Sequence, residues 1–187
     1  PKIVERSDRK VVQLPQVRDR LASRDQPNPG NTAYTIDWDH KHFADVSADV
    51  TPPGTEYGEG HRGRGGLVFW QDPKNFIMVS MYLDDSYDGA SIAIFSHLDG
   101  FEEIYDAVWS MVGRKIYYGR SHRLRVTFDG MNLMTYIDDE PVLYRKLSDI
   151  YIDRDPMCIN RLGVVVNWEW GDDTGTRFNG FEARADG

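Results

Sequence analysis

Six aromatic and planar polar side chains in this sequence could together contact a sugar. A carbohydrate site needs a flat aromatic face for the C–H surface of the sugar and planar polar groups for its hydroxyls. The parity of neighbouring apolar residues turns such side chains outward from their predicted strands: Trp70 (if Leu67 and Phe69 point inward), Tyr82, Arg123, Arg125, Asn167 and Glu169. The alternative is an ordinary solvated sheet face with Arg–Glu pairs across strands, worth roughly 0.2–1 kcal/mol each. The sequence does not say which of these residues share a sheet.

Two acidic loops offer oxygen ligands for calcium. Residues 84–89 place oxygen-bearing side chains at alternate positions and end in glycine, the spacing with which a calcium-binding turn converges hard oxygens. The segment is not an EF-hand, because Phe95 stands where a bidentate Glu is required. Asp84, Asp88 and, from the second loop, Asp172 are therefore the calcium candidates, and plain acidic hairpin loops are the alternative.

Other motifs give weaker signals. The glycine-rich segment 57–66 lacks the following helix that a phosphate-binding loop needs, because a strand is predicted there. His40 and His42 stand two residues apart, which indicates zinc only weakly. Cys158 is the only cysteine, which excludes an intrachain disulfide and a Cys-based zinc site.

Short strands must position these groups. Apolar residues alternate with polar ones along residues 43–50, 66–70, 76–83, 91–97, 123–128, 132–137, 162–170 and 178–184. Turn signals stand at Asp129-Gly130 and at residues 138–141. Trp168 and Trp170 continue the parity of the core residues before them. Residues 101–112 fit either an amphipathic helix or an irregular strand, and the bounding glycines favour the strand. So many short strands predict an all-β, two-sheet antiparallel β-sandwich.

Composition bounds the function. The chain has 187 residues, 40% of them hydrophobic, which suits one domain with a substantial core. A net charge of −8 argues against nucleic acid or an anionic membrane as the main partner. No apolar run approaches the roughly 20 residues of a membrane-spanning helix, so membrane insertion is not expected.

The N-terminal stretch differs from the remainder of the chain. Residues 1–25 are net basic and run into a turn-rich segment before residue 33. We expect 1–32 to be a polar arm or linker, with at most a short strand or helix, and 33–187 to be the domain. Because the chain begins with Pro1, we also expect a processed form or a piece of a larger protein with flanking domains.

Several segments together resemble a known family. The chain is similar to concanavalin A-like lectin/glucanase domains of the laminin-G-like kind. The similarity lies in residues 43–50, Arg64-Gly-Gly-Leu-Val-Phe69, residues 122–130 and 134–138, Arg161-Leu-Gly-Val164 and the closing Arg177-Phe-Asn-Gly-Phe181. In that family these segments are successive strands of a two-sheet jelly roll. The resemblance spans residues 33–185 and implies the fold, glycan contact and often a structural calcium.

The resemblance also bears on catalysis. Jelly-roll glucanases related to this fold usually carry Glu-x-Asp-x-x-Glu on one strand, and this sequence has no such run. Glu169 would be the catalytic candidate only with an acid from another strand. We therefore expect a non-catalytic carbohydrate-binding module of a larger extracytoplasmic protein. A polysaccharide-active glycoside hydrolase or lyase and a structural or protein-interaction domain are the alternatives.

Overall fold

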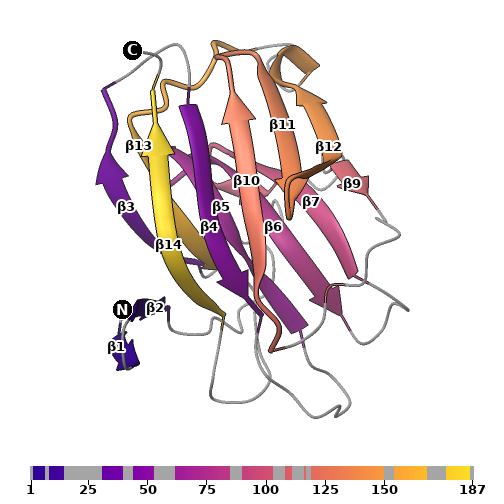
Figure 1. Ribbon diagram of the computed structural model, residues 1–187. Helices are drawn as coiled ribbons and strands as arrows, with labels where there is room; N and C mark the ends of the chain where they lie inside the picture. The colour runs from indigo at the N-terminus through magenta and orange to yellow at the C-terminus, as the bar shows by residue number, and fades with distance from the viewer. Residues whose placement is uncertain are drawn as a thin grey trace.

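The computed structural model describes residues 2–6, 9–14, 31–39, 44–52, 62–84, 90–102, 108–110, 116, 119–149, 154–167 and 176–185. These residues form two antiparallel sheets packed face to face, as Figure 1 shows. Between β12 and the segment that leads to β13 lies one turn of 3-10 helix, η2 (Leu147–Asp149). Within the described part, no helix is long and apolar enough to cross a membrane.

Sheet A has the strand order β1-β2-β14-β4-β10-β11-β12. Its strands are β1 (Lys2–Arg6), β2 (Arg9–Gln13), β14 (Arg177–Arg184), β4 (Ala44–Thr51), β10 (His122–Phe128), β11 (Asn132–Ile137) and β12 (Glu140–Lys146). Sheet B has the order β3-β13-β5-β6-β7-β8, and β9 also pairs with β7. Its strands are β3 (Asn31–Asp37), β13 (Arg161–Asn167), β5 (Arg62–Asp72), β6 (Asn75–Asp84), β7 (Ala90–Leu98), β8 (Phe101–Glu102) and β9 (Val108–Ser110). The predicted two-sheet antiparallel β-sandwich is confirmed.

Alternating apolar residues from both sheets build the main core. Val46 and Leu124 of sheet A and Phe69, Val79 and Leu162 of sheet B are all buried in one cluster. Because successive side chains of a strand point to opposite faces, this parity turns Arg123, Arg125 and Trp70 away from the core, as predicted.

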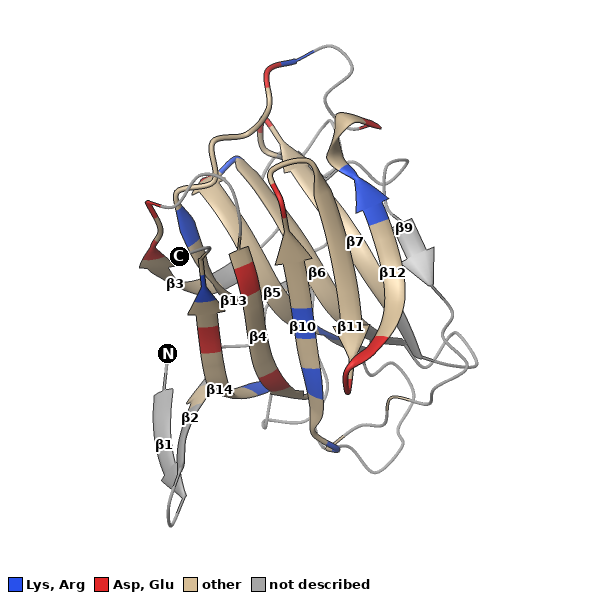
Figure 2. Cartoon of the chain, turned by 45° about the horizontal axis from the view of Figure 1, so that its top comes forward, with Lys and Arg blue, Asp and Glu red and all other residues tan. Residues whose placement is uncertain are grey.

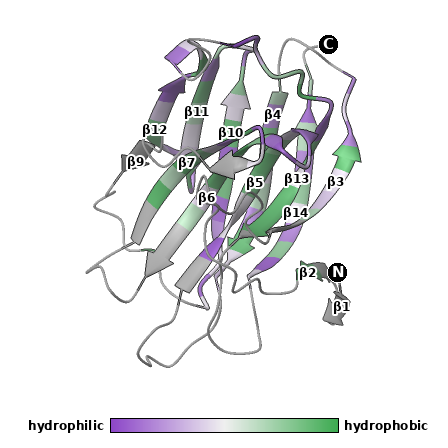
Figure 3. Ribbon diagram, turned by 180° about the vertical axis from the view of Figure 1, so that it is seen from behind, coloured by the Kyte–Doolittle hydropathy of each residue, from purple (hydrophilic) through white to green (hydrophobic). Residues whose placement is uncertain are grey.

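The outer face of sheet B carries a second, smaller set of buried apolar residues. It comprises Val68, Phe76, Met78, Ala93, Phe95 and Val165. A strand that is buried on both faces carries apolar residues at odd and at even positions, and β6 has that composition. Figure 3 views the molecule from this side. Among the described side chains, the centre of this outer face is therefore buried and apolar.

Two predicted elements differ in detail from the structure, and one open alternative is decided by it. The expected arm contributes to sheet A, since β2 pairs with β14 and Leu14 is buried in the main core, so residue 32 is not the edge of the sandwich. Residues 101–102 and 108–110 are strands, which confirms the favoured alternative for those positions. The turn expected at residues 138–141 is shorter, because Asp138 and Asp139 adopt positive φ and Pro141 already lies in the edge strand β12.

Candidate functional site

The predicted sugar-binding surface is divided between the two sheets. Trp70 lies on β5 of sheet B, whereas Arg123 and Arg125 lie on β10 of sheet A. The three side chains therefore project from opposite sides of the sandwich, and the expectation that they line one surface is wrong. Alternation determines whether a side chain faces the core, but only strand pairing determines which sheet carries it.

The other predicted ligand contacts are only partly described. Tyr82 and Asn167 belong to β6 and β13 of sheet B, the sheet of Trp70, and their side chains lie outside the described part. Glu169 lies outside the described residues, as do Trp168 and Trp170. Their part in a binding site stays a prediction.

Arg123 is fully engaged on the outer face of sheet A. Its Nη1 donates to Asp49 Oδ1 at 3.2 Å and to the carbonyl oxygen of Gly180 at 2.7 Å, and its Nη2 donates to Ser47 Oγ at 2.7 Å. A bulge in β14 brings the Gly180 carbonyl there, and Gly180 has the positive φ of 56° that glycine tolerates best. Glu182 completes the network with an ion pair at 3.6 Å.

Arg125 is paired in the same way. It donates from Nε and Nη2 to the two carboxylate oxygens of Asp45, both at 2.8 Å, and its guanidinium lies over the Tyr136 ring. The hydrogen bonds from Arg125 hold the pKa of Asp45 below its ordinary value, against the opposing effect of partial burial. Figure 2 shows these blue and red bands side by side on β10, β4 and β14. This pattern is that of an ordinary sheet face with cross-strand ion pairs.

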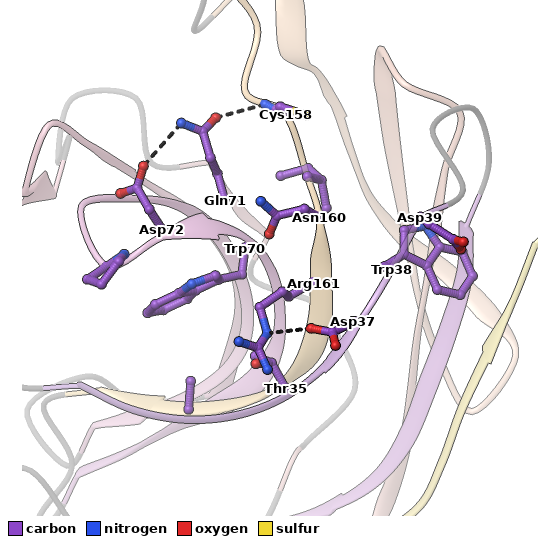
Figure 4. Close-up of a pocket in the computed structure, with 13 residues that line it drawn as sticks. Thr35, Asp37, Trp38, Asp39, Trp70, Gln71, Asp72, Cys158, Asn160 and Arg161 are labelled. Carbon is purple, nitrogen blue, oxygen red and sulfur yellow. Dashed lines mark hydrogen bonds and ion pairs between the residues drawn. The ribbon is translucent and has the colours of Figure 1, made fainter.

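A pocket of about 1080 Å³ opens beside Trp70 at one end of sheet B. Figure 4 shows it between the end of β5, the end of β3 and the segment that enters β13. Its lining includes Trp70, Arg161, Asp37, Thr35, Asn160, Gln71 and Asp72.

The indole of Trp70 is held in this pocket by stacking on other rings. It stacks on Phe76 with ring centroids 4.7 Å apart and an interplanar angle of 17°. Phe76 in turn stacks on His97 at 4.0 Å. Phe76 and His97 are buried, whereas Trp70 is half-buried. Since Phe76 lies on the β6 side, the opposite face of the indole is turned toward β13.

Arg161 and Asp37 continue the row of Trp70 across the sheet. Arg161 pairs in register with Trp70 on one side and with Asp37 on the other, so all three side chains lie on the outer face. The Arg161 Nε lies 3.5 Å from Asp37 Oδ1, and the two side chains are 45% and 94% exposed. Such an exposed pair contributes little to stability. The Arg161 side chain is open to solvent, on the strand next to that of Trp70.

Backbone and amide hydrogen bonds hold the rim of the pocket. Asn160 accepts from the backbone N–H of Trp38 at 2.7 Å and donates its own N–H to the Trp70 carbonyl at 3.0 Å. Gln71 Oε1 accepts from the Cys158 N–H at 2.8 Å, and its Nε2 donates to Asp72 at 3.1 Å. The segment before β13 is thereby tied to both β3 and β5.

Asp72 accepts hydrogen bonds that stabilise the turn between β5 and β6. Desolvation would raise the pKa of its carboxyl, but hydrogen bonds from Asn75, the Lys74 N–H and Gln71 outweigh that effect and lower it. Asp72 is therefore a charged structural carboxylate and not a proton donor near neutral pH.

Gly163 allows close strand packing beside the pocket. It follows Arg161 on the outer face of β13 and pairs with Thr35 of β3. A Cβ at this position would lie 2.0 Å from the carbonyl oxygen of Tyr34. Only glycine fits, and the surface beside Thr35 consequently carries no side chain from this position.

Comparison with known proteins bears on the fold. No protein-family model and no curated protein matches the chain. A functionally unknown protein from Saccharomyces cerevisiae is similar in structure, with a TM-score of 0.61, 12% identity and coverage of 99% of this chain and 92% of that one. The carbohydrate binding module CBM66 from Bacillus subtilis gives a TM-score of 0.54 at 16% identity, covering 94% and 95%. A tetrameric galectin from the ball sponge Cinachyrella sp. gives 0.57 at 13% identity, covering 81% and 99%.

The chain has the concanavalin A-like jelly-roll fold. This is the lectin-like β-sandwich that the sequence motifs indicated, and at these identities the likeness concerns the fold alone. The jelly roll carries its candidate site on the outer face of sheet B, at the end where β3, β13 and β5 meet.

Sequence reasoning missed most of this site. Arg161 entered only as part of a strand motif, and no pattern singled out Asp37. Asn160 and Gln71 gave no signal, because their roles arise from the contact between the segment before β13 and the β5–β6 turn. The outward parity of Trp70 was the one usable clue.

The calcium candidates of the jelly roll are mostly not described. Asp84 is the last residue of β6 and its side chain lies outside the described part, as do Asp88 and Asp172 altogether. Among the side chains that are described, no group of three or more His, Cys, Asp or Glu could hold a metal ion. The calcium site stays a prediction.

Proposed function

We propose that this lectin-like jelly roll is a non-catalytic carbohydrate-binding module whose ligand occupies the Trp70 pocket. The observation that carries the proposal is the row Trp70–Arg161–Asp37, which places an upright indole beside a solvent-accessible guanidinium on one sheet face. CBM66 is named as a carbohydrate binding module, and galectins are lectins, which supports the same class of ligand.

The geometry suggests how a sugar is held. Its C–H face packs on the indole face opposite Phe76, where an aromatic ring offers apolar area at little entropic cost. Arg161 then donates to adjacent hydroxyls with its planar fork, and the exposed Asp37 accepts from them. The Asn160 amide is exposed at the rim and extends the polar side of the site.

The described carboxylates of the pocket support a binding role over hydrolysis. Glycoside hydrolysis needs one carboxylic acid that is still protonated at working pH, facing a second carboxylate across the scissile bond. Asp72 has a lowered pKa and is hydrogen-bonded within its turn, so it is not the protonated acid that hydrolysis needs. Asp37 forms an ion pair with Arg161, and Asp39 is the third described carboxylate of the lining.

The proposal includes the setting of the module. We place it in a larger extracytoplasmic protein, where polysaccharides are encountered, with a structural calcium held by Asp84, Asp88 and Asp172. Fractionation of the native protein tests the first part, and binding with and without chelator tests the second.

The test is a broad glycan array in calcium, repeated with chelator, with released sugars assayed in the same wells. Binding without release, lost in Trp70→Ala and Arg161→Ala but kept in Arg123→Ala, is the expected result. Release of sugars would instead indicate an enzyme. Binding that is lost in Arg123→Ala and kept in Trp70→Ala would place the site on sheet A.

A further inference from the structure

We propose that two copies of this chain associate through strand β3, whose free edges pair antiparallel and join the two B sheets into one. The proposal concerns self-association and does not depend on what the Trp70 pocket binds. It rests on the pairing, composition and exposure of β3.

β3 is an open edge of sheet B. It pairs with β13 through seven consecutive residues without a register shift, and among the described strands it pairs with no other. Within the described part of the chain, its other side therefore presents a row of backbone N–H and C=O groups, which is a template for another strand.

The composition of β3 does not protect this edge. Its sequence, Asn-Thr-Ala-Tyr-Thr-Ile-Asp, contains no Lys, Arg or Pro, and its one charge is at the terminal Asp37. The opposite margin of the molecule differs, because β12 contains Pro141, Glu140, Arg145 and Lys146 and pairs through a register shift. Proline, charge and irregular pairing are the features with which proteins discourage edge-to-edge association. Sheet B ends on its other side in β8 and β9, strands of two and three residues.

Apolar side chains on β3 are left uncovered. Tyr34 and Ile36 are 50% and 42% exposed, although their parity with Val164 and Leu162 points them toward the core side of the sheet. They border an apolar groove of about 120 Å³ between β3 and β14, which Phe178 and Phe181 also line. Figure 1 shows β3 and β14 along the same side of the sandwich.

If two copies of β3 pair antiparallel about Tyr34, the backbone groups of the free edge form hydrogen bonds and no like charges are brought together. Tyr34 of one copy then lies opposite Tyr34 of the other, Ile36 opposite Thr32, and Asp37 opposite Asn31. Aromatic and β-branched pairs across strands are favourable, and no like charges face each other. A second copy of this chain is therefore the occupant that fits. The two Trp70 pockets would lie on the same face of the joined sheet, because Thr35 and Asp37 of β3 line each of them.

Sedimentation velocity over a concentration series tests the proposal. Wild type is expected to reach a species of twice the 21.5 kDa chain mass. Tyr34→Lys and Ile36→Lys should each raise the dissociation constant by about tenfold or more, because each places a charge in the pairing edge. Tyr144→Lys is the matched control, since Tyr144 is 54% exposed on β12.

Hydrogen exchange of the wild type gives a second readout that needs no variant. The amides of β3 should become more protected as protein concentration rises, while those of β12 should not change. A monomer at every concentration would overturn the proposal. So would a dimer that both β3 variants retain, or one that Tyr144→Lys disrupts equally.

Discussion

Arg161 of β13 and Trp70 of β5 are directly paired residues, and both side chains lie on the outer face of sheet B. Phe76 supports the indole from the far side, so the free indole face is turned toward the arginine. This relationship gives the jelly roll its candidate sugar site. It depends on strand register, because the two residues lie far apart in sequence.

Replacing Trp70 should abolish most of the binding. Trp70→Ala removes the apolar face and is expected to weaken glycan affinity by roughly tenfold or more, whereas Trp70→Phe should keep part of it. Calorimetric titration measures the change, and thermal melts separate it from unfolding caused by loss of the Phe76 stack. Tyr144→Ala, an exposed aromatic on sheet A, should bind like wild type. Equal affinity of Trp70→Ala and wild type would remove the indole from the site.

The planar shape of Arg161 should matter more than its charge. Arg161→Lys keeps the charge but loses the fork that contacts two hydroxyls, so we expect a several-fold loss of affinity with unchanged stability. Arg184→Lys serves as the control, because Arg184 is 73% exposed on sheet A and forms an ion pair with Glu182 of the same strand. If Arg161→Lys binds as tightly as wild type, the guanidinium makes no directional contact with the ligand.

The Arg125–Asp45 pair should contribute to stability in a pH-dependent way. Arg125 holds the pKa of Asp45 below its usual value, so the folded state binds fewer protons than the unfolded state in this range. The contribution is therefore present above the unfolded pKa of about 3.9 and is lost as pH falls through the lower folded value.

Arg125→Ala should accordingly lower the free energy of unfolding by about 0.2–1 kcal/mol at neutral pH, the range of ion pairs near the surface. The difference from wild type should shrink in acid. Urea unfolding at neutral and acidic pH measures it, and a difference that grew toward low pH would have the wrong sign. Glycan affinity should not change, because sheet A lies on the other side of the sandwich.

Gly163→Ala should be among the most destabilising single substitutions in the chain. The new Cβ would lie 2.0 Å from the Tyr34 carbonyl oxygen, a backbone atom that cannot move without opening the β3–β13 ladder. Gly130→Ala is a suitable comparison, because that position has a φ of +91° but open space around it, so only backbone strain is added. Thermal melts should show a larger loss for Gly163→Ala, and the reverse order would contradict the tight packing of β3 on β13.

The sequence predicted the strands well because their parity is local. Leu67 and Phe69 directed Trp70 outward, and Leu124 and Val126 did the same for Arg123 and Arg125. The fold then followed from the number of such strands and from the family resemblance.

The site could not be predicted to the same extent, because it depends on contacts between distant segments. Nothing in residues 154–160 indicates that Asn160 will join Trp38 to Trp70, since both hydrogen bonds exist only once β3 and β5 flank β13. The assignment of Arg123 and Trp70 to one surface failed for the same reason. Parity is a property of one strand, whereas sheet membership is a property of the whole topology.

The most direct test is a titration of the isotopically labelled protein with an array-selected oligosaccharide, followed by nuclear magnetic resonance. The indole N–H signal of Trp70, assigned by its absence in Trp70→Phe, should shift saturably together with the backbone signals of Asn160 and Arg161. Signals of Arg125 and Tyr136 on sheet A should stay in place. Saturable shifts on sheet A with an unmoved Trp70 signal would contradict the proposed site.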